Sequence, residues 1–179
     1  MLQVIARRIA FKIAFRGAVC MSAVAGTEAI PYVDMRGQLG CSAWPQRDPS
    51  TVKTLVIHHT AGSLYDTPKT VSDYHRIAKG WACIGYTWTC DADGVIVQCN
   101  DLSDKTNHAQ YNNSKTCALA LIGNFHEQHP TEAMKASVRA HVDLAHRVYG
   151  IERVVFHCDL KATECPGMHA IAEFIDIHS

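Results

Sequence analysis

Continuous apolar runs in this chain predict buried β-strands. Thr54–His58, Cys117–Ile122 and Val154–His157 are short, rich in residues that favour strands, and lack the alternation of a half-exposed strand. Two further segments, Gly85–Cys90 and Val95–Cys99, flank Asp93-Gly94 and predict a hairpin. The expected hairpin register places Trp88 opposite Cys99 and Val97 opposite Cys90, so a Cys90–Cys99 disulfide is not expected.

Three segments with helical periodicity follow or separate these strands. Thr67-Pro68 predicts a helix start and Gly80 its end, with an apolar stripe of Val71, Tyr74 and Ile77 or Ala78. The clearest helix is Thr131–Tyr149, which has Thr131 as its cap, Gly150 after its end, and a stripe formed by Met134, Val138, His141, Ala145 and Val148. Met168–His178 predicts a short final helix.

The alternation of strands and helices predicts one α/β domain, with a central mixed sheet flanked by helices. We place this domain at residues 51–179 and treat residues 1–50 as a basic, irregular N-terminal extension. Within that extension, residues 27–53 carry several prolines and glycines and are expected to be an irregular lead-in.

Residues 1–16 carry four basic residues and no acidic one, and they lead into the small apolar stretch Gly17–Gly26. Three interpretations are open for this segment: a cationic arm that touches a membrane or envelope, an atypical secretion signal, or a poorly ordered tail. Its charges extend through Arg16 and its apolar part is short, unlike an ordinary signal peptide.

The composition is that of an ordinary globular protein, with 47% hydrophobic and 19% charged residues among 179. The formal net charge of zero gives no case for nucleic-acid binding, and we expect a monomer. Eight cysteines show no small-scaffold spacing. We expect most of these thiols to be reduced and buried, as in a protein folded in a cytoplasm; a few disulfides in a secreted protein are the alternative.

Two histidines and one cysteine suggest a metal site. His58 and His157 each end an apolar run, and Cys165 follows His157 on the same loop. If the two strands end at the same edge of the sheet, their histidines converge. Two imidazoles and a thiolate are natural zinc ligands, and three protein ligands leave a fourth position for water, as in catalytic zinc sites.

Four motifs occur in order and together resemble those of a known family. They are VIHHTAG (56–62), GWACIGYTWTCDADGVIVQC (80–99), HAQYNNSKTCALALIGNF (108–125) and FHCDLKATECPG (156–167). This set resembles the zinc-dependent N-acetylmuramoyl-L-alanine amidases, which include phage endolysins, and the related peptidoglycan recognition proteins. The resemblance runs from about Thr54 to the C-terminus. It implies one Zn²⁺ per chain, held by His58, His157 and Cys165, and bacterial peptidoglycan as the substrate.

The resemblance also assigns roles to residues around the ligands. It implies that Tyr86 is a catalytic residue that donates to the oxyanion, although a core aromatic is the alternative. Thr163 falls where related enzymes carry a catalytic lysine or threonine. His108 and Asn113 fall in a motif that borders the substrate groove, and His59 is assigned to the same substrate-binding set. Outside these roles, Trp81 is expected to pack rather than stack on sugar, and Asp159 either supports a ligand or forms a turn.

The implied activity is hydrolysis of the amide between N-acetylmuramic acid and L-alanine. Two other classes stay open: a non-catalytic peptidoglycan-binding module, and a thiol hydrolase with cysteine as nucleophile. The compact domain with its short cationic arm suggests a phage or prophage endolysin, made in the host cytoplasm and acting on the wall at lysis. A bacterial wall-recycling amidase, periplasmic or secreted if residues 1–26 are a signal, is the alternative.

Overall fold

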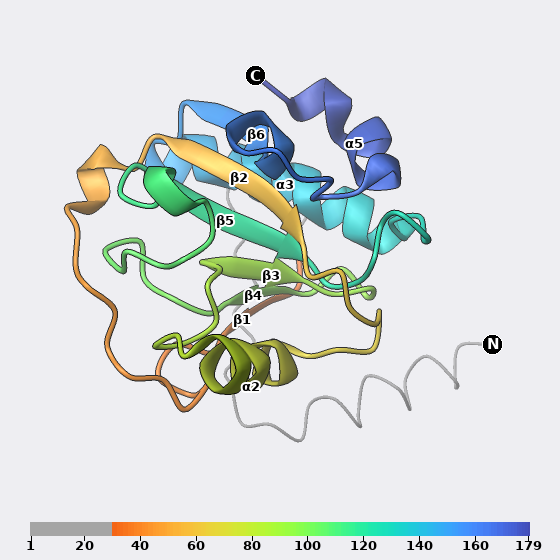
Figure 1. Cartoon of the computed structure of the whole chain (residues 1–179). Helices are drawn as coiled ribbons and strands as arrows, with labels where there is room; N and C mark the ends of the chain where they lie inside the picture. The colour runs from red at the N-terminus through yellow and green to blue at the C-terminus, as the bar shows by residue number, and fades with distance from the viewer. Residues whose placement is uncertain (1–29) are drawn as a thin grey trace.

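The computed structural model of the chain describes residues 30–179, and its centre is one six-stranded mixed sheet (Figure 1). The strand order is β1-β4-β3-β5-β2-β6, in which only the β3–β4 pair is antiparallel. The strands are β1 (Tyr32–Asp34), β2 (Thr54–His59), β3 (Trp88–Cys90), β4 (Ile96–Gln98), β5 (Thr116–Leu121) and β6 (Arg153–Phe156).

Helices cover both faces of this sheet. The α-helices are α2 (Pro68–Lys79), α3 (Glu132–Tyr149), α4 (His157–Leu160) and α5 (Met168–Phe174), and the 3-10 turns are η1 (Pro49–Thr51), η2 (Gln110–Asn112) and η3 (Ile175–Ile177). Helix α2 lies on one face, and α3 lies on the other (Figure 1). This arrangement confirms the predicted α/β fold with a helix-flanked mixed sheet. Within residues 30–179, no helix combines the length and the apolarity that a membrane span requires.

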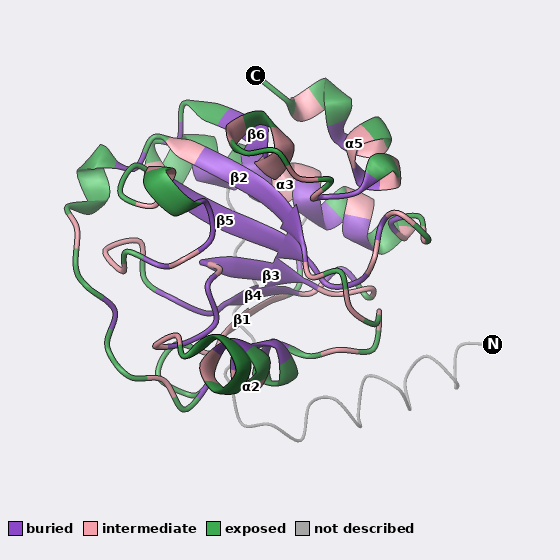
Figure 2. Cartoon of the chain, viewed as in Figure 1, coloured by how far each residue is buried: buried purple, intermediate pink, exposed green. Residues whose placement is uncertain are grey.

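Burial of both sheet faces explains the continuous apolar runs. All six residues of β5 are buried, as are the last five of β2 (Figure 2). Leu55, Ile57 and Leu119 pack with α3 and α5 in the larger apolar cluster. A smaller cluster on the α2 side contains Val71 and Ile84. Because side chains alternate along a strand, neighbouring residues of β2 face different layers of the molecule.

The ends of the two long helices are as predicted. The Thr67 hydroxyl caps α2 by accepting from Thr70 N, and the Thr131 hydroxyl caps α3 by accepting from Met134 N. Gly150 ends α3 in the left-handed conformation, with φ of 66°, which a glycine adopts without strain.

The predicted apolar stripe of α2 is confirmed at Val71 but is wrong at Tyr74 and at Ile77 or Ala78. Tyr74 and Ile77 are 55% and 84% exposed, whereas Val71, Ser72 and His75 are the buried residues beyond the first turn. The buried face is polar in part because it meets backbone groups: the Ser72 hydroxyl lies 3.4 Å from the Leu39 carbonyl oxygen. Val148, the last residue of the predicted α3 stripe, is also exposed.

Two strand predictions also need correction. Tyr32–Asp34, inside the segment expected to be irregular, forms β1 and pairs with β4. In the hairpin, Trp88 pairs with Gln98 and Cys90 with Ile96, one residue away from the predicted register. The turn explains the shift, because Asp91 pairs with Val95 around a three-residue loop, and Asp91 Oδ1 also accepts from Val95 N.

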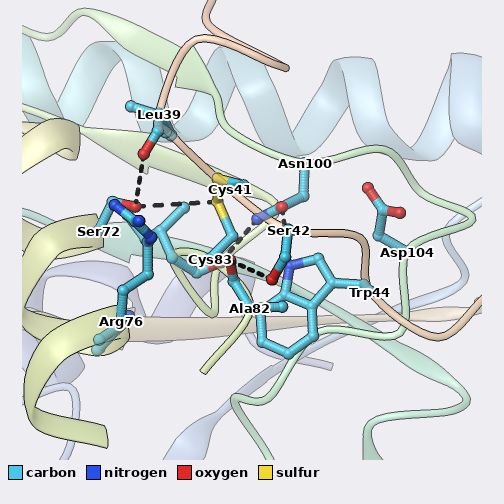
Figure 3. The surroundings of a disulfide bond; sticks show 12 residues. Leu39, Cys41, Ser42, Trp44, Ser72, Arg76, Ala82, Cys83, Asn100 and Asp104 are labelled. Carbon is cyan, nitrogen blue, oxygen red and sulfur yellow. Dashed lines mark hydrogen bonds between the residues drawn. A yellow bond between two sulfur atoms is a disulfide. The ribbon is translucent and has the colours of Figure 1, made fainter. Parts of the chain in front are cut away.

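Five cysteines of the described chain are free, as predicted for most of them: Cys90, Cys99, Cys117, Cys158 and Cys165. The prediction is wrong for Cys41 and Cys83, which form a disulfide (Figure 3). This bond attaches residues from before β2 to the segment that leads into β3. A cavity of about 550 Å³ next to it, lined in part by Trp44 and Asn100, contains none of the predicted site residues.

Candidate metal centre

The three predicted ligands lie together where β2 and β6 end. Ile57 pairs with Phe156 across these parallel strands, so the residues that follow leave the sheet at the same edge. His58 is the fifth residue of β2, and His157 is the first residue of α4. Their ring centroids are 4.4 Å apart, and ligand atoms of both histidines and of Cys165 all lie within 4.8 Å of one another.

The loop that carries Cys165 is held by backbone hydrogen bonds. Cys158 N donates to the Cys165 carbonyl oxygen at 3.0 Å, and the Thr163 hydroxyl accepts from Cys165 N at 3.3 Å. The sulfur itself accepts from the backbone N–H of His59 at 3.4 Å. An N–H donor aimed at the sulfur stabilises the thiolate that a metal site requires.

Burial sets the protonation of the three donors. It lowers the pKa of His58 and of His157, so both imidazoles are neutral near pH 7 and offer a lone pair. Burial also raises the pKa of the Cys165 thiol to about 12, so the thiolate needs a nearby cation. Two neutral imidazoles and one sulfur form a donor set that fits zinc.

Tyr86 lies beside this cluster. Its ring centroid is 5.4 Å from that of His58 and 5.4 Å from that of His75. The backbone of Tyr86 and of the residue before it is held by two side chains: Asn100 Nδ2 donates to the Tyr86 carbonyl oxygen, and Gly85 N donates to His75 Nδ1 at 3.0 Å. Burial, reinforced by nearby Cys165, raises the pKa of the phenol, so Tyr86 is a hydrogen-bond donor at neutral pH.

His108 also contacts the cluster, through a hydrogen bond to His58. Asn113 lies further back: its side-chain oxygen accepts from the backbone N–H groups of His108 and Ala109, at 3.1 and 2.7 Å. That oxygen therefore shapes the loop that presents His108.

The structure does not bring the His59 ring to the cluster. Its Nδ1 accepts from Phe125 N at 3.2 Å, on the α3 face of the sheet, because side chains alternate along β2. Trp81 packs against His75, with ring centroids 4.7 Å apart. Asp159 forms a turn, since it accepts from Phe156 N and pairs with His178.

Two residues near the site had no recognisable signal in the sequence. Arg47, in the proline-rich lead-in, donates to the carbonyl oxygens of Asn113 and Thr116 and so fastens the loop between them. Thr116 contacts the His108 ring. The Arg47 contacts join segments far apart in sequence, whereas Thr116 is only eight residues from His108. Local periodicity carries no information about either contact.

Comparison with known proteins places this geometry in context. A family model described as N-acetylmuramoyl-L-alanine amidase (Amidase_2) matches residues 48–168. The chain is 26% identical to peptidoglycan-recognition protein LB of Drosophila melanogaster, over 75% of this chain and 66% of that protein, just under two thirds of its length. It is 27% identical to a further peptidoglycan-recognition protein, from Drosophila simulans, over 83% of this chain and 85% of that protein.

A solved structure with the same fold is that of LysCS from Clostridium intestinale URNW, described as an endolysin N-acetylmuramoyl-L-alanine amidase. The two structures superpose with a TM-score of 0.71 at 25% identity, over 84% of this chain and 97% of that one.

Proposed function

Because the chain belongs to the Amidase_2 family of N-acetylmuramoyl-L-alanine amidases, we propose that it is a zinc-dependent peptidoglycan hydrolase. It would cleave the amide between N-acetylmuramic acid and the L-alanine of the stem peptide. The observation that carries this proposal is the convergence of His58, His157 and Cys165 at one edge of the sheet, with Tyr86 beside them.

Each residue has a role that its contacts support. His58, His157 and Cys165 would hold one zinc ion, which supplies Lewis acidity that activates water and polarises the scissile carbonyl. The Tyr86 hydroxyl would donate to the oxyanion that develops on that carbonyl. The Thr163 hydroxyl accepts from Cys165 N but keeps its own hydrogen, so it can serve as a second donor.

Digestion of purified peptidoglycan tests the proposal directly. The expected product is new L-alanine amino termini, lost when a chelator removes the metal and restored when zinc is added back. Cys165→Ser should abolish release. Cys158→Ser is the matched control, because Cys158 lies seven positions earlier and is outside the ligand cluster.

The same assay separates the alternatives. A thiol hydrolase would keep its activity in chelator, whereas a binding module would sediment with peptidoglycan and release nothing. New reducing sugar ends in place of amino termini would refute the amidase assignment.

We also propose that the protein is an endolysin that is made in a host cytoplasm and acts on the wall at lysis. The fold shared with LysCS supports this setting. The predicted cationic segment, residues 1–16, lies outside the described residues. A chain lacking residues 1–26 should digest isolated wall as well as the full chain does but lose activity on whole cells. Export of the full chain with removal of these residues would instead favour a periplasmic or secreted wall-recycling amidase.

A further inference from the structure

The His108 ring connects His58 to the backbone. His108 is only 8% exposed, and its Nδ1 lies 3.2 Å from His58 Nε2. On the opposite side of the ring, Nε2 lies 3.3 Å from the Thr116 carbonyl oxygen and 3.2 Å from the Thr116 hydroxyl oxygen. Both ring nitrogens of His108 are therefore engaged within the protein.

The positions of the hydrogens follow from Thr116. Its carbonyl oxygen can only accept, and its hydroxyl donates to the Asn112 carbonyl oxygen at 2.8 Å. His108 Nε2 must therefore carry the hydrogen that both Thr116 oxygens accept. A neutral imidazole carries one ring hydrogen, so His108 Nδ1 is an acceptor. The hydrogen shared with His58 must then belong to His58 Nε2.

This direction determines which nitrogen of His58 is free. With its hydrogen on Nε2, neutral His58 has its lone pair on Nδ1. Nδ1 is also the atom that faces the cluster, 3.6 Å from Cys165 Sγ. The alternative tautomer of His108 would aim its Nε2 lone pair at the Thr116 carbonyl oxygen. Two acceptors would then face each other with no hydrogen between them.

We propose that His108 is a positioning residue that fixes the ring orientation and tautomer of His58 so that Nδ1 is presented to the metal. This inference rests on the proposed zinc site, and it gives His108 a different task from contacting substrate. The support behind His108 is itself fastened, because Arg47 donates to the same Thr116 carbonyl oxygen and Asn113 holds the His108 backbone. Ligand histidines in metalloproteins are commonly oriented by a partner on their second nitrogen.

Two substitutions of His108 test the contacts of its two ring nitrogens separately. In His108→Asn, the side-chain oxygen takes the place of Nδ1 and can still accept from His58. In His108→Gln, the amide reaches the place of Nε2 and keeps the Thr116 contact but not the His58 contact. The dissociation constant of zinc, measured on metal-free protein by competition with a chromophoric chelator, requires no substrate.

We expect His108→Gln to weaken zinc binding by about 10- to 100-fold, the range for loss of such a partner, and His108→Asn to bind zinc nearly as tightly as the unaltered chain. Tyr111→Ala is the matched control, because Tyr111 lies on the same loop, is 92% exposed and should leave zinc affinity unchanged. Thermal unfolding of each metal-free variant verifies that it is folded.

Unaltered zinc affinity in His108→Gln, or equal weakening in both variants, would overturn the positioning role while leaving the zinc site intact. Failure of the unaltered chain to bind zinc would overturn the proposed function itself.

Discussion

Acid lability of this fold should depend strongly on His141 of α3. Its ring is fully buried, and neither ring nitrogen has a hydrogen-bond partner among the described residues. It packs edge-on against Trp88, with ring centroids 4.7 Å apart, inside the larger apolar cluster. Burial alone lowers the pKa of His141 from 6.5 to about 3. The folded protein therefore keeps this ring neutral at pH values where the unfolded chain protonates it.

The sign and size of the effect follow from proton linkage. Between pH 6.5 and about 3 the unfolded state binds the extra proton, so the free energy of unfolding falls as the pH falls through this window. At pH 5 the loss relative to pH 7.5 is about 2 kcal/mol, and it approaches about 5 kcal/mol once the pH is below the folded-state pKa. A loss of that size is comparable with the whole stability of many domains, about 5–15 kcal/mol.

His141→Phe is the perturbation that tests this reasoning. It keeps an aromatic ring against Trp88 and removes both unpartnered nitrogens, so we expect stability at pH 7.5 to rise by about 1 kcal/mol or more. Urea unfolding at pH 7.5 and pH 5 should show the unaltered chain losing about 2 kcal/mol more than the variant. His146→Gln, an exposed position of the same helix, is the control. Equal losses in the unaltered chain and His141→Phe would refute the argument, since other buried histidines contribute equally to both.

Three further outcomes can be checked. Replacing Cys41 and Cys83 by serine should lower the free energy of unfolding by up to about 4 kcal/mol, because the bond closes a loop with a sequence separation of 42. In urea unfolding, a reductant should have no further effect on this double variant. Tyr86→Phe should lower kcat by about 10²- to 10³-fold without changing zinc content, and unchanged kcat would remove the phenol from the mechanism. His75→Leu leaves Gly85 N without its acceptor, so it should lower the free energy of unfolding by about 1–3 kcal/mol and also lower kcat. His75→Asn supplies an acceptor oxygen and should restore both quantities. Equal loss in both variants would contradict this account.

Features with a local signal were predictable from the sequence. The helix caps Thr67 and Thr131 act on backbone groups three residues away, so their sequence context determines them. Which face of α2 is buried, in contrast, could not be predicted from local sequence. Its buried residues include Ser72 and His75, which find backbone partners in Leu39 and Gly85, respectively. Both partners come from other segments of the chain. The Cys41–Cys83 disulfide depends on the same long-range packing.

In the candidate site, too, some features were predictable from the sequence and others depend on long-range contacts. His58 and His157 were predictable together because each ends an apolar run, and parallel strands bring such ends to one edge. The tautomer of His58 was not predictable, because it depends on the carbonyl of Thr116, which accepts from both His108 and Arg47. Arg47 belongs to a segment expected to be irregular, yet it fastens the loop that orients His108. If that chain of contacts sets the tautomer, the lead-in before β2 contributes to metal affinity although it supplies no ligand.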